Sequence, residues 1–235
     1  MQSLKFSQSQ VSVLLRALSK NVLSLPQLYE KFSLWDTSLS LSEFQRAFRN
    51  FSYQYLKPYQ NKSYHLIYTP LYIIGVKYFL RQVYFYFPGY YRGDYYFLSS
   101  MNYNLFHDFL MSVLSSYLGK LGLAFSVHNS FAGRDLSNDL VIPKLKIAFE
   151  VETGLKTHIS TDLNQRLGIV PVHQEHINKR FVNNFFTYVL VPNDDLKIRY
   201  FKYFTSLSDK FGFSVFETYK FNIYTFYEFS KIQLI

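Results

Sequence analysis

The sequence predicts an α/β protein, more narrowly α+β, in two parts, and three observations lead to this prediction. The chain has 235 residues, of which 49% are hydrophobic and 20% aromatic, so a full core can form. The first 55 residues have apolar side chains at helical spacing. From about residue 100 onward, helical segments alternate with short apolar strands, which is typical of a central sheet flanked by helices. We therefore expect a helical N-terminal domain over residues 1–85 and a domain with a central mixed sheet over residues 86–235.

Three helices are expected before residue 56. The first covers residues 10–20, where valine and leucine recur at helical spacing. The second covers residues 25–33 and has a proline in its first turn, where the missing backbone N–H costs nothing. The third covers residues 40–55, and it begins with a capping-box pattern because Ser40 lies three residues before Glu43.

A hairpin is expected directly after the third helix, with residues 55–57 and 63–68 as its strands. Three short helices followed by a hairpin form the layout of a winged helix-turn-helix domain, whose third helix enters the major groove of DNA. The alternative is a small helical bundle that docks on the second domain. In the first interpretation the residues that contact DNA are Gln45, Arg46, Arg49 and Asn50 on the helix and Lys57 and Lys62 in the hairpin.

Positive charge is concentrated in the first part of the chain. The whole chain has a formal net charge of +9. Residues 1–100 contain 11 Lys and Arg against four Asp and Glu, whereas residues 101–235 contain 14 against 12. A basic, tyrosine-rich segment suits a polyanion, because Lys and Arg release counterions from phosphates. The plain alternative is that the charge serves solubility.

The second part is expected to begin with a helix and to continue with a sheet. Residues 71–86 fit either a helix or a pair of strands. After residue 100 the expected order is helix, three strands, helix, strand, helix and strand. These elements cover residues 103–121, 123–128, 138–142, 145–152, 162–180, 185–191, 194–211 and 213–216.

Three carboxylates are expected to converge at one edge of this sheet. Alternation along the third strand directs Leu145, Ile147, Phe149 and Val151 to one face and Lys146, Ala148, Glu150 and Glu152 to the other. Asp139 lies on the preceding strand, so hairpin pairing could bring it beside Glu150. Such carboxylates repel one another unless a cation neutralises them, and oxygen ligands suit Mg²⁺ or Mn²⁺. The alternative is that Glu150 and Glu152 line a face open to solvent.

Residues 101–218 resemble the PD-(D/E)xK nuclease superfamily, which has the restriction-endonuclease-like fold. The resemblance rests on a helix, a strand with Asp, a hairpin, a strand with E-x-E, a helix and a strand. Asp139 corresponds to the motif Asp and Glu150 to the second motif acid, whereas Glu152 stands where Lys is usual and Asn138 where Pro is usual. Lys156 or Lys146 could supply the missing cation.

The resemblance also implies accessory groups outside the strands. In members with an acid on the first helix, that acid assists metal binding, and Asp108 is the corresponding residue here. Its neighbour His107 could carry a proton. Gln165 could face the site from the next helix. The alternative for His107 and Asp108 is an ordinary pair on a helix surface.

Taken together, these features predict a metal-dependent DNA endonuclease. The resemblance implies that Asp139 and Glu150 hold Mg²⁺ or Mn²⁺ with help from Asp108, that Glu152 is a third metal ligand or a base that orients the water, and that Lys156 stabilises the phosphate. A winged helix before such a domain also resembles the replication-relaxation proteins of plasmids, which implies a role in plasmid or viral DNA replication, recombination or mobilisation. DNA is the expected partner, and a homodimer would suit cutting of both strands. The alternative is a sequence-specific DNA-binding protein with a decayed nuclease domain.

The sequence also excludes several classes. The chain has no cysteine, which rules out disulfides, a cysteine nucleophile and cysteine-containing zinc sites. The longest apolar region, residues 64–87, is interrupted by Pro70, Gly75, Lys77 and Arg81. We therefore expect neither a signal peptide nor a membrane span, and a cytoplasmic location. The tyrosine-rich composition agrees with a thermophilic host or its virus.

Overall fold

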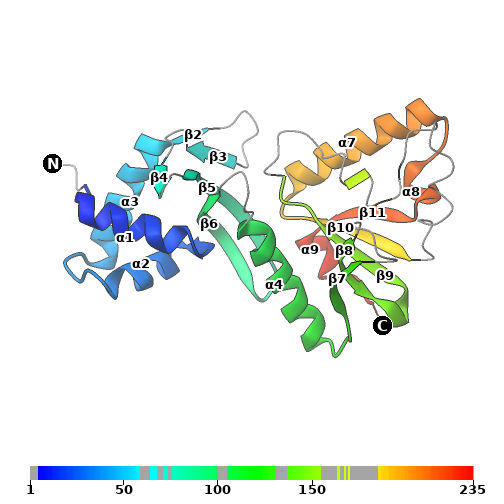
Figure 1. Ribbon diagram of the computed structural model, residues 1–235, viewed down its shortest axis with the longest axis horizontal. Coiled ribbons are helices and arrows are strands. Elements are labelled where there is room, and N and C mark those ends of the chain that lie inside the picture. Colours follow the sequence, from blue (N-terminus) through cyan, green and yellow to red (C-terminus); the bar gives the residue numbers. More distant parts are fainter. Residues whose placement is uncertain are drawn as a thin grey trace. The chain divides into compact units, whose positions relative to one another are not determined.

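The computed structural model describes residues 5–58, 64–67, 71–73, 76–99, 105–130, 137–154, 163–164, 167, 169 and 185–234. It confirms the mixed α/β class, with helices and two sheets (Figure 1). The chain divides into two compact units, residues 1–109 and 110–235. This division falls within helix α4 (Leu105–Lys120), whereas the boundary that we predicted after residue 85 falls within strand β5 (Val76–Phe87).

All three predicted N-terminal helices are confirmed. They are α1 (Gln8–Leu18), α2 (Leu25–Ser33) and α3 (Leu41–Tyr55). The capping box before α3 is present, because the Ser40 N–H donates to the Glu43 carboxylate at 2.9 Å and the Glu43 N–H donates to the Ser40 hydroxyl. Hydrogen bonds from Ser40 also lower the pKa of Glu43.

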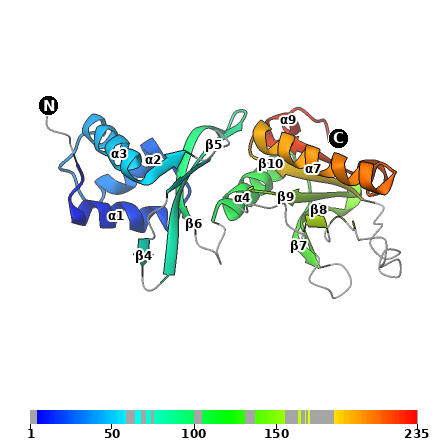
Figure 2. The same cartoon turned by 90° about the horizontal axis from the view of Figure 1, so that it is seen from above.

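The apolar faces of these helices form one core with the sheet of the first unit. Figure 2 shows the three helices gathered on one side of the long strands. Leu41, at the start of α3, is exposed and lies outside this core. The core consists of Leu14, Leu18, Leu23, Leu28, Phe32, Phe44, Phe48, Phe51, Leu80, Tyr96 and Leu98.

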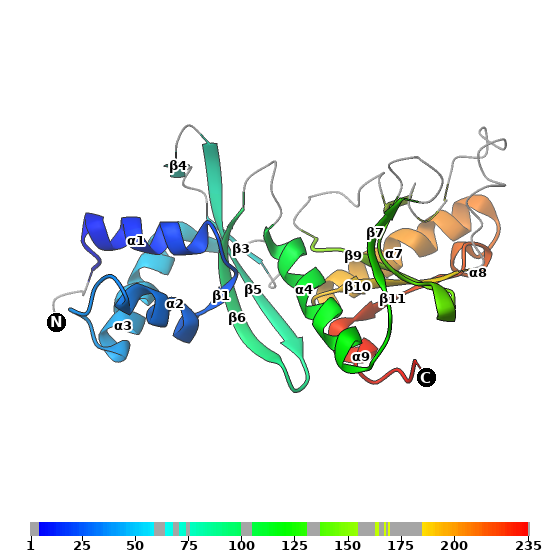
Figure 3. The same ribbon diagram turned by 60° about the horizontal axis from the view of Figure 1, so that its bottom comes forward.

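The sheet of the first unit is antiparallel throughout. Its strands are β1 (Leu23–Ser24), β2 (Leu56–Pro58), β3 (Tyr64–Ile67), β4 (Leu71–Ile73), β5 and β6 (Tyr91–Ser99), in the order β1-β6-β5-β3-β2 with β4 on β5. The predicted hairpin is confirmed by the pairing of β2 with β3. Residues 71–86 are strands where they are described, as their tyrosines and phenylalanines favour, and β5 and β6 form a long hairpin (Figure 3).

The sheet of the second unit is mixed and has five strands. They are β7 (Ser126–Ser130), β8 (Ser137–Ile142), β9 (Ile147–Val151), β10 (Phe186–Val191) and β11 (Phe221–Thr225), in the order β11-β10-β9-β8-β7. The strands β7, β8 and β9 pair antiparallel, whereas β9, β10 and β11 run parallel.

Helices cover both faces of this sheet. On one face, Phe204 of α7 (Asp194–Phe211) packs against Phe221 with ring centroids 4.9 Å apart. On the other face, Phe229 of α9 (Phe226–Phe229) packs against Phe149 at 5.3 Å and against Tyr188 at 5.6 Å. When helices cover both faces of a sheet, the side chains on both faces of its strands are buried.

Three predicted elements of this unit differ from the structure. The closing strand over residues 213–216 is wrong, because the Ser214 hydroxyl accepts from the Glu217 N–H and starts a short helix, α8 (Val215–Thr218). The sheet closes with β11 instead. The strand predicted from residue 145 begins at Ile147, after the 3₁₀ turn η2 (Pro143–Leu145) and a left-handed Lys146. The strand predicted over residues 123–128 begins later, at Ser126.

The remaining predicted elements fall into two groups. The helix over 103–121 corresponds to α4, the strand over 185–191 to β10, and the helix over 194–211 to α7. The helix predicted over residues 162–180 lies almost wholly outside the described residues. Among the helices that the structure describes, none has the length and apolarity that a bilayer span needs.

A glycine substitution tests the packing behind the end of β9. Gly154 has φ of +64°, and a Cβ there would clash with the Leu196 side chain, whereas Gly212 has φ of +73° and a Cβ there would meet no atom within 4 Å. We expect Gly154→Ala to lower the free energy of unfolding by roughly 2–4 kcal/mol, from the left-handed backbone and overpacking together. Gly212→Ala should cost only about 1 kcal/mol. Urea unfolding measures both values, and equal losses would contradict the predicted contact.

Candidate functional site

The candidate site is built where β8 meets β9. Their antiparallel pairing sets Leu140 opposite Phe149. Continuing this register by one residue places Asp139 opposite Glu150, as the hairpin prediction required. The Asp139 carboxylate also accepts a hydrogen bond of 2.7 Å from the Val151 N–H on the neighbouring strand. The two strands therefore hold these two acids in fixed positions, side by side in the sheet.

Both acids are removed from water. Asp139 is 5% exposed and Glu150 is 0% exposed. Glu150 pairs in register with Val189, and Val189 pairs with Ile223, so Glu150 lies on the sheet face that α7 covers. The alternative that Glu150 lines a solvent face is therefore wrong. The physical reason is that α7 packs on the face of β9 that carries Glu150, whereas the alternation of side chains along a strand does not reveal whether a helix covers a given face.

Glu152 lies just beyond the end of β9 and is only half-buried. Its N–H donates to the Leu190 carbonyl at 2.9 Å, which extends the parallel pairing by one residue. Its carboxylate accepts a hydrogen bond of 2.8 Å from the Tyr200 hydroxyl of α7. The tyrosine therefore orients Glu152 from the same face of the sheet that carries Glu150.

The electrostatics of this site favour a positive partner. Two carboxylates on neighbouring strands repel each other, and the repulsion is strong where water is excluded. A divalent cation or a shared proton would relieve it. The oxygen ligands of Asp139 and Glu150 fit Mg²⁺ or Mn²⁺, which often bind through one or two carboxylates and keep several waters. Within the described ranges, however, no group of three or more His, Asp or Glu side chains is arranged to hold a metal ion.

The accessory residues are placed unevenly. His107 and Asp108 lie in the first turn of α4, where the His107 Nδ1 is 3.8 Å from the Asp108 Oδ1. The Asp108 side chain is 57% exposed and the His107 side chain 21%, and the metal-assisting role stays a prediction. Asp108 belongs to the first compact unit, whereas the three strand acids belong to the second. Lys156 and Gln165 lie outside the described residues.

The predicted DNA-contacting residues of α3 lie away from the core. Arg46 and Arg49 are exposed, while Gln45 and Asn50 are half-buried. The opposite face of α3 is buried through Phe44, Ala47, Phe48 and Phe51. Lys57 is in β2, and Lys62 lies outside the described residues. Arg46 and Arg49 thus place positive charge on the exposed face of α3, while the opposite face packs in the core.

Tyr200 is the residue of this site that sequence reasoning missed. It is buried in α7, and its hydroxyl reaches Glu152 across 48 residues of sequence. The chain has 22 tyrosines, so residue type alone does not single it out. Its position in α7 at helical spacing from Leu196 and Phe204 indicates a core residue and does not indicate a polar partner.

No protein-family model, curated protein or solved structure matches this chain.

Two substitutions of Asp139 separate its hydrogen bond from its charge. Asp139→Ala should lower the free energy of unfolding by about 1–3 kcal/mol, because the buried Val151 N–H loses its acceptor. Asp139→Asn keeps an acceptor oxygen and removes one of two adjacent buried charges, so we expect little loss. Urea unfolding near neutral pH measures both. Equal losses in the two variants would argue against charge repulsion at this site.

Proposed function

We propose that this protein is a metal-dependent DNA endonuclease. The observation that carries the proposal is the pair of buried acids, Asp139 and Glu150, on adjacent antiparallel strands. Buried carboxylates destabilise a fold unless they are compensated, so two of them together point to a site that binds a cation.

The order of elements supports the same proposal. Helix α4 precedes the antiparallel strands β7, β8 and β9, and β10 then returns parallel to β9. Asp139 lies on the second strand and Glu150 on the third, as the resemblance to PD-(D/E)xK nucleases implies. The order of the elements and the positions of the two acids thus both fit the resemblance, and each is a separate feature of the chain.

The residues divide the chemistry among them in this proposal. Asp139 and Glu150 hold Mg²⁺ or Mn²⁺, which when bound activates water and stabilises charge on the phosphate. Glu152, oriented by Tyr200, accepts the proton of the attacking water. The water oxygen bonds to phosphorus, the bond to the 3′ oxygen breaks, and that oxygen takes a proton from solvent. The products are a 5′-phosphate and a 3′-hydroxyl. Lys156 stabilises the phosphate, and Asp108 and His107 remain candidate accessory groups.

The first unit selects the DNA in this proposal. A small strand between α1 and α2 pairs into the sheet that follows α3, which agrees with a winged helix-turn-helix arrangement. Arg46 and Arg49 of α3 are then the groove-facing cations. Plasmid or viral replication, recombination or mobilisation is the proposed context, and a homodimer is the proposed form for cutting both strands.

The decisive experiment is cleavage of supercoiled plasmid and of branched and single-stranded DNA with Mg²⁺ or Mn²⁺. Glu150→Gln keeps the size of the buried side chain and removes its charge, so we expect a folded protein with cleavage reduced roughly 100-fold or more. Mn²⁺ should raise the thermal stability of the wild type, and the same variant should lose this effect. Asp209→Asn, an exposed acid of α7, is the matched control and should behave as wild type.

The second candidate function is a DNA-binding protein with an inactive nuclease fold. Glu152 at the position usually held by Lys favours it, as does the lack of a three-acid cluster among the described residues. DNA binding without cleavage, together with no effect of Mn²⁺ on wild-type stability, would select this function and reject the endonuclease.

Arg49 tests the role assigned to α3. Arg49→Ala should weaken duplex binding and reduce the slope of log affinity against log salt by about 1, because one phosphate contact is lost. Fluorescence anisotropy over a range of salt concentrations measures both quantities. Lys210→Ala, an exposed cation at the end of α7, is the control. Unchanged binding by Arg49→Ala would contradict the winged-helix interpretation.

A further inference from the structure

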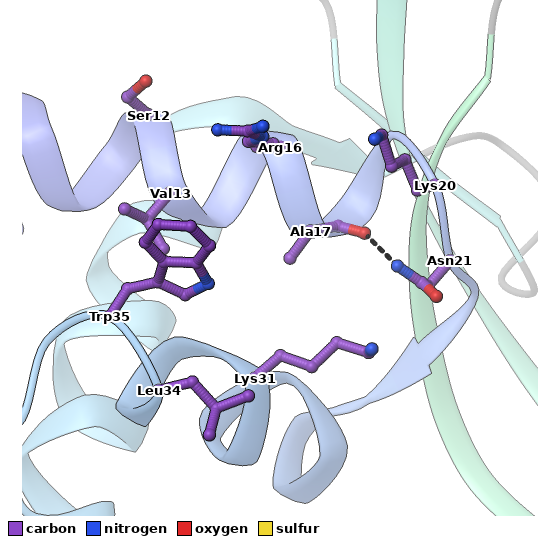
Figure 4. Close-up of a pocket in the computed structure, with 9 residues that line it drawn as sticks. All are labelled: Ser12, Val13, Arg16, Ala17, Lys20, Asn21, Lys31, Leu34 and Trp35. Atoms are coloured by element: carbon purple, nitrogen blue, oxygen red, sulfur yellow. Dashed lines mark hydrogen bonds between the residues drawn. The ribbon is translucent and has the colours of Figure 1, made fainter.

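A pocket lies between α1 and the end of α2, on a part of the first unit that the proposed function does not use. Its volume is about 370 Å³, within the range of small-ligand sites. No residue of α3 is among those that line it. Figure 4 shows α1 above the gap and Lys31 extending along the gap toward Asn21. The pocket is thus separate from the arginines assigned to duplex binding.

The pocket is positively charged. Arg16 lies in the last turn of α1, Lys20 follows just after the end of that helix, and Lys31 approaches from α2. All three side chains are exposed, and none of the described residues that line the pocket is acidic. Positive charges that line one pocket repel one another. An anion bound between them would be attracted by all three side chains and would offset this repulsion.

An exposed aromatic platform stands beside these cations. Trp35 is 71% exposed and its neighbour Leu34 is 79% exposed. The Arg16 guanidinium carbon lies 5.8 Å from the centre of the Trp35 ring. An indole ring this open to water offers a flat apolar surface on which a nucleobase can stack.

The backbone holds this platform in place. The Trp35 N–H donates to the Phe32 carbonyl at 3.0 Å. The next residue, Asp36, accepts a hydrogen bond of 2.9 Å from the Gln10 side chain of α1. At the other end of the pocket, the Asn21 side chain donates to the Ala17 carbonyl at 2.9 Å, and this bond is drawn in Figure 4. A site whose walls are fixed in this way loses little entropy when a ligand binds.

We propose that this pocket binds unpaired nucleotides of single-stranded DNA, with a base stacked on Trp35 and adjacent phosphates on Arg16, Lys20 and Lys31. The choice of DNA strand rests on the proposed function, which makes DNA the substrate. An acidic peptide would satisfy the cations but would leave the flat indole surface without a matching partner. Duplex DNA satisfies the phosphate contacts, yet its bases are stacked on one another and are not available to Trp35.

The chain itself carries the probe for this proposal, since Trp35 is its one tryptophan. Titration of the full-length protein with a short oligothymidylate should quench the tryptophan emission, while a duplex of equal length should quench it much less. Anisotropy with a labelled oligothymidylate should show Trp35→Ala binding about 5- to 150-fold more weakly, the loss expected from one base stack. Trp35→Phe keeps an aromatic ring and should recover most of the affinity.

The cations are tested by the salt dependence of the same binding. Arg16→Ala and Lys31→Ala should each lower the slope of log affinity against log salt by about 0.7, the value for one phosphate contact on a single strand. Lys210→Ala should leave the slope unchanged. Because all these side chains are exposed, the variants are expected to fold.

Three results would overturn the proposal. One is single-strand binding that neither changes the Trp35 emission nor weakens in Arg16→Ala. Another is the absence of single-strand binding. The third is equal quenching and affinity with polyglutamate, which would assign the pocket to an acidic peptide. Duplex cleavage and the Arg49→Ala measurement do not depend on Trp35, so failure of this proposal and failure of the proposed function give different results.

Discussion

β8 and β9 are held in one register by the backbone pairs Leu140–Phe149, Val141–Ala148 and Ile142–Ile147, and the candidate site depends on that register. A slip by one residue would send every side chain of β9 to the opposite face of the sheet. One residue beyond the Leu140–Phe149 pair, the same register sets Asp139 opposite Glu150, and the Val151 N–H donates to the Asp139 carboxylate. The 3₁₀ turn and the left-handed Lys146 between the strands set this register, because they fix the length of the connection.

The helices that pack on the sheet then determine the electrostatic environment of these acids. With α7 on the face that carries Glu150 and α9 on the face that carries Phe149, both sets of side chains on β9 are buried. Burial strengthens the repulsion between neighbouring carboxylates, and it equally strengthens their attraction to a cation. Tyr200 and Glu152 lie at the edge of this region, where β9 ends and the Tyr200 hydroxyl donates to the half-buried carboxylate.

In the first unit, apolar side chains form the core and several cationic side chains lie on the surface. Its core is made by the apolar faces of α1, α2 and α3 against β1, β5 and β6, while cations such as Arg16, Lys31 and Arg49 stay exposed. Exposed cations lie on α3, with Arg46 and Arg49, and around the pocket between α1 and α2, with Arg16, Lys20 and Lys31. An arrangement of this kind suits a protein that contacts nucleic acid through more than one surface, because phosphates attract cations without requiring deep burial.

The sequence by itself determined the class of fold, the three N-terminal helices, the β2–β3 hairpin, α4, α7 and the central strands, because these depend on local periodicity and on caps such as Ser40 with Glu43. It also brought Asp139 and Glu150 together, since one short connection joins their strands. It did not reveal α8 in place of a strand, where the Ser214 cap outweighs the apolar pattern. Only the tertiary structure decided that Glu150 is buried, that Tyr200 orients Glu152, and that Trp35 stands beside Arg16. The physical reason is that each of these contacts joins separate elements, and a pattern along one element carries no information about what packs against it.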